Sequence, residues 1–442
     1  MKIPQSPPDP QLLAKLTPER LTRVLELHRQ AAQEGSPYYH WDDLRHRSPP
    51  TGYTHEEWWL GLKLARAMSL RRLPLEDAAG SAFTLSAPDT LLELASKVDR
   101  EASGGIELSE DVRDSDRRDR YIVNSLIEEA ITSSQLEGAA TTRKVAKEML
   151  RAGRQPRTHG EYMIANNYQA MERIRSSHTE PLTPQFVLEL HRTATADTLS
   201  ASDSGRLRRA DEDIKVTWND LVLHTPPPAD QLEARLEALC RFANGETPDR
   251  YLHPAVRAAI VHFWLAYDHP FIDGNGRTAR GLFYWSMLHE GYWLAEFLSV
   301  SRLLRKAPAQ YARSFLYTET DENDLTYFVL HQLDTVLHAI ADLQKHLERE
   351  MQKTRETERL LRPGSGLNHR QIAVLSRCLK KPSSRFTIAS HQRSHAIAYG
   401  TARTDLQDLA RRGFLTLQVE GKRQVFAAAT DLGDAITRLD HA

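Results

Sequence analysis

Residues 269–280 read His269-Pro270-Phe271-Ile272-Asp273-Gly274-Asn275-Gly276-Arg277-Thr278-Ala279-Arg280, a segment that combines two closely spaced glycines with two arginines, an aspartate and a histidine. Two glycines one residue apart allow positive backbone φ angles and a close approach to a ligand. The N–H groups of such a loop converge, and a helix that follows it adds the positive end of its dipole. The pattern therefore favours a bound phosphate.

The side chains of the segment add charge and acid–base chemistry. Arg277 and Arg280 are three residues apart, so they share one face of the expected helix and suit a polyphosphate, which arginine binds through two hydrogen bonds. Asp273 supplies a hard oxygen ligand for Mg²⁺ beside those phosphates. His269 lies four residues earlier and is a side chain suited to general-base work. Together they predict nucleotidyl or phosphoryl transfer to a protonated nucleophile.

The composition predicts a cytoplasmic globular protein. The chain has 442 residues, 40% hydrophobic and 26% charged, and a net charge of −1, so it holds two to three domains and is not a polycation. Cys240 and Cys378 are the two cysteines, which argues against a disulfide framework or a cysteine zinc site. The first residues lack the apolar stretch of a signal peptide, and no run approaches the roughly 18 apolar residues of a membrane span.

Helical periodicity dominates, so we expect a mainly α fold. Helices are predicted at residues 18–32, 55–69, 120–136, 160–176, 183–194, 229–243, 253–267 and 276–289. Residues 213–224 instead have short β-prone arms around Asn219-Asp220, which predicts a β-hairpin. A lone hairpin on a helical body is marginally stable, so it is a candidate flap over a site.

Changes in pattern divide the chain into four parts. Residues 1–115 form an N-terminal helical region, with aromatic residues that we expect to pack a small core and no assigned function. Residues 116–346 hold the long helices and the phosphate-type loop. Residues 347–366 are a helical linker that ends in Arg362-Pro363-Gly364-Ser365-Gly366. Residues 367–430 read as three helices and a β-hairpin, the pattern of a winged helix-turn-helix.

The last part is also basic, and DNA and protein are both candidate partners for it. Phosphate contacts would come from Arg385, Arg393, Arg403, Arg411, Arg412, Lys422 and Arg423. Winged helices also bind proteins, and exposed charges often only solvate a helix, so both partners stay under consideration.

The segment at 269–280 matches the Fic signature, His-x-Phe-x-(Asp/Glu)-Gly-Asn-Gly-Arg-x-x-Arg, at all eight fixed positions. The chain therefore resembles the Fic (Fic/Doc) family from about residue 116 to residue 346. The resemblance implies a Fic-type helical bundle with a β-hairpin flap. It also implies a protein adenylyltransferase, an enzyme that transfers AMP from ATP to a Ser, Thr or Tyr hydroxyl of a protein.

The resemblance assigns a role to each matching residue. His269 resembles the base that deprotonates the target hydroxyl, and Asp273 the Mg²⁺ ligand. Gly274, Asn275 and Gly276 resemble the anion-binding loop, Arg277 and Arg280 the phosphate ligands, and Phe271 the buried anchor of the loop. Val216, Thr217 and Trp218 fall in the flap that aligns a target segment by strand addition. Tyr311 aligns loosely with the border of the adenine pocket.

A second motif lies upstream, at Ser133-Ser134-Gln135-Leu136-Glu137-Gly138. It resembles the family's inhibitory motif, (Ser/Thr)-x-x-x-Glu-(Gly/Asn). The spacing puts Ser133 and Glu137 one turn apart on one helix face, and Gly138 ends that helix. By this resemblance Glu137 pairs with Arg280 and competes with the γ-phosphate of ATP, so the enzyme is autoinhibited. The alternative is an ordinary glutamate near a helix end.

Three other functions remain open from the sequence. The first is a DNA-binding transcriptional regulator whose Fic domain responds to a nucleotide. The second is transfer from another donor, such as another nucleotide or phosphocholine, although Gly276 favours AMP transfer because kinase-like relatives carry lysine there. The third is removal of AMP, with Glu137 positioning water. ATP, a protein substrate or the chain itself are the expected partners. Related proteins commonly pair, so a homodimer is also an expectation.

Overall fold

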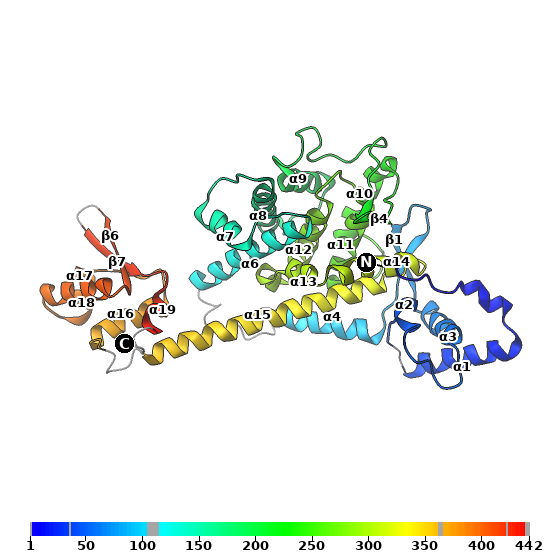
Figure 1. Ribbon diagram of the computed structural model, residues 1–442, viewed down its shortest axis with the longest axis horizontal. Helices are drawn as coiled ribbons and strands as arrows, with labels where there is room; N and C mark the ends of the chain where they lie inside the picture. The colour runs from blue at the N-terminus through cyan, green and yellow to red at the C-terminus, as the bar shows by residue number, and fades with distance from the viewer. Residues whose placement is uncertain (1, 35–36, 104–114, 361–365, 421–422, 438–442) are drawn as a thin grey trace. The chain divides into compact units, whose positions relative to one another are not determined.

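The computed structural model describes residues 2–34, 37–103, 115–360, 366–420 and 423–437 (Figure 1). The described residues are mainly helical, which confirms the predicted fold class. Two compact units can be distinguished, one of residues 1–108 and 121–340 and the other of residues 109–120 and 341–442. The four domain boundaries expected from the sequence stay predictions. No described helix is both long enough and apolar enough to span a membrane.

The N-terminal part of the first unit is helical with one small sheet. Its elements are η1 (Pro10–Lys15), α1 (Pro18–Glu34), α2 (Trp41–Leu44), α3 (His55–Ala67), β1 (Arg71–Glu76), β2 (Ala82–Leu85) and α4 (Asp89–Ala102). Trp41 and Trp59 pack with Leu44 and Leu62 in a small core, as expected for the aromatic cluster. The β1–β2 hairpin was not predicted, because only Leu73 and Leu75 alternate with exposed residues in β1.

The remainder of the first unit contains the predicted helices within a few residues of their expected ends. Its helices are most of α6 (Ser115–Leu136), then α7 (Arg143–Ala152), α8 (His159–Ser177), α9 (Pro184–Thr195), η2 (Ala229–Gln231), α10 (Leu232–Ala243), α11 (Pro254–Asp268), α12 (Asn275–His289), η3 (Trp293–Phe297), α13 (Val300–Lys306), α14 (Pro308–Thr320) and the start of α15 (Thr326–Leu360). The core forms around α11 and α12, which pack on each other. Nearly every residue of α11 is buried, which fits its largely apolar sequence.

The predicted β-hairpin, called the flap below, is present as β3 (Val216–Trp218) and β4 (Leu221–His224), an antiparallel two-stranded sheet. Asn219 turns the chain with a φ of 53°, in the left-handed region that asparagine tolerates better than most residues. Val216 pairs with His224, and Trp218 pairs with Leu221. Leu221 and Val222 are 39% and 45% exposed, so β4 is held by few buried contacts.

The second unit contains the expected helices and hairpin. Its elements are the end of α15, then α16 (His369–Lys380), β5 (Arg385–Thr387), α17 (Ile388–His395), α18 (Tyr399–Arg411), β6 (Leu415–Glu420), β7 (Arg423–Ala428) and α19 (Leu432–Thr437). A three-stranded sheet has the order β5-β7-β6, so the hairpin gains a third strand that the sequence did not predict. Residues 361–365 of the predicted linker and residues 421–422 of the predicted hairpin turn lie outside the described residues. The winged-helix classification and DNA binding stay predictions.

Candidate active site

The loop between α11 and α12 takes a left-handed conformation at each end. His269 caps the C-terminus of α11 with a φ of 45°, and Gly274 caps the N-terminus of α12 with a φ of 81°. A Cβ at Gly274 would lie 2.7 Å from Cγ2 of Thr195 on α9. Glycine is therefore required at 274 for both φ and space. The predicted tight turn into a helix N-terminus is present.

His269 presents one ring nitrogen for chemistry. Its Nδ1 lies 3.2 Å from the carbonyl oxygen of Ala266, which can only accept a hydrogen bond. Nδ1 must therefore carry the proton, which leaves Nε2 with a lone pair. Burial lowers the pKa of His269 to about 4, so the ring is neutral at pH 7. A neutral imidazole with a free Nε2 can accept a proton, as a general base must.

Asn275 fixes the loop through its side chain. Its Oδ1 accepts a hydrogen bond from the N–H of Phe271 at 2.9 Å, and its Nδ2 donates to the carbonyl of Phe271 at 2.8 Å. These two bonds satisfy both backbone groups of a buried residue. The side chain of Asn275 thus holds the loop's shape, and only its backbone N–H remains for the anion-binding role expected from the sequence.

Phe271 is fully buried, and His191 of α9 supports it. The two rings stack with centroids 3.7 Å apart. Nε2 of His191 donates to the carbonyl of Asp273 at 2.8 Å, and Nδ1 accepts from the N–H of Gly205 at 2.9 Å. Burial lowers the pKa of His191 to about 4, so the ring is neutral at pH 7. Its single proton lies on Nε2, as this pair of hydrogen bonds requires. The sequence gave no signal for this histidine, because it lies on an otherwise ordinary amphipathic helix.

Arg277 and Arg280 have different surroundings although they share a helix. The Arg277 side chain is completely buried and donates to the carbonyl of Ala194 at 2.5 Å and to Asp273 at 3.2 Å. It therefore ties the loop to α9 and orients Asp273, whose side chain is 47% exposed. Arg280 instead lies beside the end of α6, where Glu137 meets it.

Glu137 and Arg280 form an ion pair in the structure. Nη2 of Arg280 donates to Oε1 of Glu137 at 2.7 Å and to the carbonyl of Ser133 at 3.0 Å, while its Nε donates to the Ser133 hydroxyl at 2.9 Å. Burial opposes the charge of Arg280, but the Glu137 carboxylate raises its pKa above the usual value. Gly138 ends the helix with a φ of 94°, as predicted.

Gly276 makes the Glu137 contact sterically feasible. A Cβ at this position would lie 2.1 Å from Oε1 of Glu137 and 2.9 Å from Nη1 of Arg280. No side chain fits there while the glutamate occupies this place. The second glycine of the loop thus leaves room for an oxyanion beside Arg280, whether from Glu137 or from a ligand.

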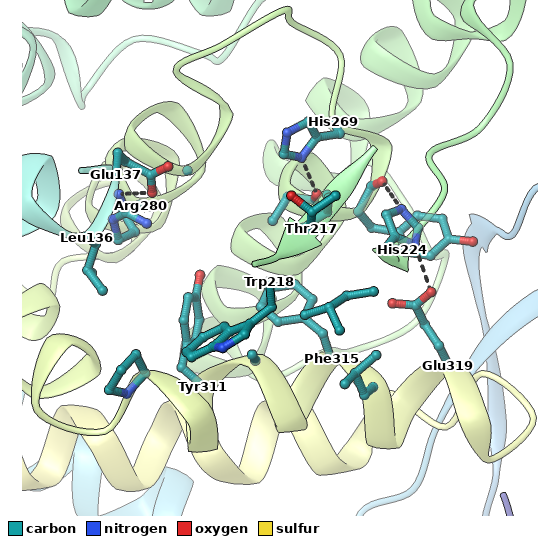
Figure 2. A pocket seen from close by; sticks show the side chains of 18 residues that line it. Leu136, Glu137, Thr217, Trp218, His224, His269, Arg280, Tyr311, Phe315 and Glu319 are labelled. Atoms are coloured by element: carbon teal, nitrogen blue, oxygen red, sulfur yellow. Dashed lines mark hydrogen bonds and ion pairs between the residues drawn. The ribbon is translucent and has the colours of Figure 1, made fainter. Parts of the chain in front are cut away.

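One cavity of about 260 Å³ brings many of the predicted residues together. Figure 2 shows His269, Arg280 and Glu137 on its walls, together with the flap and α14. Val216, Thr217 and Trp218 line it from the flap, and Tyr311 lines it from α14. Asp273, Asn275 and Arg277 are not among its lining residues, so they act on the loop from outside this cavity.

Tyr311 is held by a neighbour on the core helix. Its hydroxyl lies 2.8 Å from Nε2 of the buried His262 on α11, and burial raises the pKa of Tyr311 to about 12. Its hydroxyl is therefore protonated at neutral pH. The prediction that Tyr311 borders a nucleotide base stays a prediction, although its place in the cavity is compatible with that role.

Glu129 is a buried residue that positions α6 and that the sequence did not reveal. It is 1% exposed and accepts hydrogen bonds from Tyr284 at 2.9 Å, Ser299 at 3.1 Å and the N–H of Ser301 at 3.1 Å. Burial raises its pKa. It fastens α6, the helix that carries Ser133, to the core. A signal was available, because an acidic residue at 129 falls on the apolar face of the helix that contains Leu126.

Comparison with known proteins identifies the domain around the loop. The Fic/DOC family model matches residues 181–287. A protein adenylyltransferase Fic of Nematostella vectensis is 28% identical over 178 residues, which is 40% of this chain and 39% of the relative. One of Drosophila grimshawi is 34% identical over 125 residues, or 28% of this chain and 24% of the relative. The chain thus spans well under half the length of these relatives.

A solved structure extends the likeness in fold. A Fic family protein from Desulfovibrio desulfuricans G20 superposes with a TM-score of 0.51 and 16% identity, over 78% of this chain and 97% of that protein. At that identity the likeness concerns the fold alone. Residues 181–287, which contain the loop, thus match the Fic/DOC family model, and the fold of the chain is similar to that of a Fic family protein.

Proposed function

We propose that this chain is an autoinhibited protein adenylyltransferase, which transfers AMP from ATP to a hydroxyl of a protein or of itself. The observation that carries the proposal is the cavity in which His269 and Arg280 face the same space, with Glu137 paired to the arginine. The relatives named protein adenylyltransferase Fic support the same reaction.

The proposed reaction uses His269 as the base. The oxygen of a Ser, Thr or Tyr hydroxyl attacks the α-phosphorus of ATP, and its proton moves to Nε2 of His269. A new P–O bond forms, the bond between the α-phosphorus and the bridging oxygen breaks, and pyrophosphate leaves. The N–H groups of Gly274 to Gly276 and the positive end of α12 stabilise the charge on the phosphates. Arg280 binds the γ-phosphate when Glu137 releases it.

Asp273 is suited to a Mg²⁺ ion bound together with the nucleotide. Its carboxylate is 47% exposed and is oriented by Arg277, so it offers a hard oxygen ligand at the open side of the loop. No group of three metal-binding side chains occurs among the described residues, so phosphate and water would complete the coordination. Bound Mg²⁺ would neutralise phosphate charge during the transfer.

Incubation with labelled ATP and Mg²⁺ tests the proposal. We expect label on Glu137→Gly protein at least about tenfold above wild type, because Arg280 loses a charged competitor. Glu137→Gln, which keeps the shape and removes the charge, should fall between the two. In the double variant Glu137→Gly, His269→Ala the label should disappear. Equal label on wild type and Glu137→Gly would contradict autoinhibition, and undiminished label on the double variant would contradict the base.

DNA binding by the second unit is a second candidate. It is favoured by the exposed face of α18, where Arg403 and Thr404 are open to solvent. Arg411 pairs with Asp408 at 3.2 Å, so not all predicted basic residues are available for phosphates. A gel shift of the full chain with Arg403→Ala as the matched variant tests it. Binding that weakens with salt and with the substitution supports DNA, and no binding at ~50 mM salt excludes it.

A further inference from the structure

His224 lies at the end of β4 with an acceptor at each ring nitrogen. Its Nδ1 is 2.7 Å from Oε2 of Glu319 on α14, and its Nε2 is 2.7 Å from the carbonyl oxygen of Tyr267 on α11. The ring also packs on the Tyr267 ring, with centroids 4.5 Å apart. Figure 2 shows His224 reaching from the flap towards Glu319 at one end of the cavity.

The two contacts together require one more proton than a neutral imidazole and an ionised carboxylate carry between them. A carbonyl oxygen and a carboxylate oxygen only accept hydrogen bonds, so each ring nitrogen must supply a hydrogen. The ring is then an imidazolium paired with Glu319, and a proton shifted onto the carboxylate leaves the total unchanged. The His224 side chain is 8% exposed and that of Glu319 is 22% exposed, so water replaces neither bond easily.

Loss of that proton removes one of the two contacts. A neutral ring keeps either the bond to α14 or the bond to α11, and the other nitrogen then turns a lone pair towards an oxygen at 2.7 Å. Those lone pairs repel each other, so the ring must move. Because His224 belongs to the flap, the flap then keeps only one of its two anchors to the helices.

The position of His224 links this contact to the cavity. Val216 is its partner across the hairpin, so the placement of His224 sets the placement of β3. β3 lines the cavity with Val216, Thr217 and Trp218. Tyr267, the other anchor, stands two residues before His269. A single side chain therefore fixes the flap to the end of the helix that carries the proposed base.

We propose that protonated His224 is a positioning residue that fastens the flap to α14 and α11, and that its deprotonation releases the flap. The consequence for the acceptor segment rests on the proposed function, because only a transferase needs that segment aligned beside His269. The attachment of the flap through His224, called the latch below, rests on the two contacts to Glu319 and Tyr267 alone.

Other charged and titratable groups surround His224 on the packed elements. They are Glu319 on α14, Tyr267, Asp268 and His269 on α11, Arg208 in the loop that contacts the His269 carbonyl, and Arg235 and Asp77 near Tyr267 and Asp268. Asp268 is paired with Arg235 at 2.6 Å, and burial raises its pKa. Burial holds His269 neutral. Glu319 is thus the acidic group in direct contact with the ring.

Hydrogen exchange of the full chain between pH 5.5 and 8.5 tests the latch without requiring activity. After correction for the intrinsic effect of pH on exchange, protection of residues 214–224 in the wild type should fall about tenfold as pH rises. In His224→Phe, which keeps a ring against Tyr267 but no donor, protection should be low and independent of pH. In Glu319→Gln the amide oxygen still accepts from Nδ1 but the ion pair is lost, so flap protection at pH 5.5 should lie below that of the wild type.

Two references separate the latch from general destabilisation. The β1–β2 hairpin should keep its protection in every variant, and His253→Phe, which removes a histidine paired with Asp99 at 3.1 Å, should leave the flap unchanged. The same pH dependence of flap protection in wild type and His224→Phe would overturn the proposal. Its failure would leave the labelled-ATP experiment untouched, and the absence of AMP transfer would leave the latch intact.

Discussion

The loop segment of residues 269–280 and the flap of residues 216–224 border the same cavity but are held in different ways. In the loop, Asn275 satisfies both backbone groups of Phe271, and Arg277 ties Asp273 to the carbonyl of Ala194. These side chains are buried except for Asp273. The flap consists of two short strands with exposed apolar residues, and His224 is its main polar attachment to the helices that we describe.

The difference assigns separate tasks to the two regions. Catalysis needs its groups within a fraction of an ångström, and the loop meets that need through bonds that the core enforces. Binding of a protein segment needs an edge that adapts to different sequences, and a weakly held hairpin provides it. We therefore expect substitutions in the loop to reduce stability, and substitutions in the flap to change acceptor binding more than stability.

The largest expected effect on stability is that of Gly274→Ala. The new Cβ would need the strained φ of 81° and would lie 2.7 Å from Thr195, so we expect a loss of about 3 kcal/mol in the free energy of unfolding. Chemical denaturation measures it. Gly291→Ala is the matched control, because its φ is 85° but no atom lies within 4 Å, and it should cost about 1 kcal/mol. Equal losses would mean that the loop is not closely packed.

Asn275→Asp should have the next largest effect. The change is isosteric, but it replaces the donor to the Phe271 carbonyl by an oxygen and adds a buried charge. We expect a loss of about 2 kcal/mol in the free energy of unfolding, together with reduced AMP transfer. A variant that keeps full stability would show that the clamp on Phe271 does not hold the loop.

Trp218→Ala should change stability by less than about 1 kcal/mol, because the flap buries little surface. Its effect should appear in the KM for the acceptor and for ATP, since Trp218 lines the cavity. Thermal unfolding and steady-state kinetics in the Glu137→Gly background separate the two quantities. A large loss of stability with unchanged kinetics would reverse the contrast between flap and loop.

The smallest expected effect is a loss of kcat/KM at acidic pH, the acid limb of its pH profile. Because burial lowers the pKa of His269 to about 4, the base is active above that pH and becomes protonated as pH falls through it. The Glu137 carboxylate raises this pKa, so in the Glu137→Gly variant kcat/KM should be halved at or below about pH 4, provided the fold persists, and His224→Phe should leave this limb in place. An acid limb near pH 6.5 would show an unshifted histidine, contrary to the structure.

The same contrast explains what the sequence could predict. The loop was predictable because its roles require particular residues at fixed spacing, and the role expected for Glu137 came from the resemblance of residues 133–138 to the family's inhibitory motif. The different surroundings of Arg277 and Arg280 were not predictable, since equal spacing on a helix does not say which side chain faces α9. His191 and His224 were missed because their partners come from distant segments, and no local pattern marks such contacts.

The competition between Glu137 and ATP for Arg280 is the central claim, and calorimetry of ATP binding tests it most directly. In a His269→Ala background, which prevents turnover, Glu137→Gly should bind ATP with Mg²⁺ at least about tenfold more tightly than the protein with Glu137, and Glu137→Gln should be intermediate. Equal dissociation constants in all three proteins would contradict the account, because the bond of 2.7 Å between Glu137 and Arg280 would then not restrain the site.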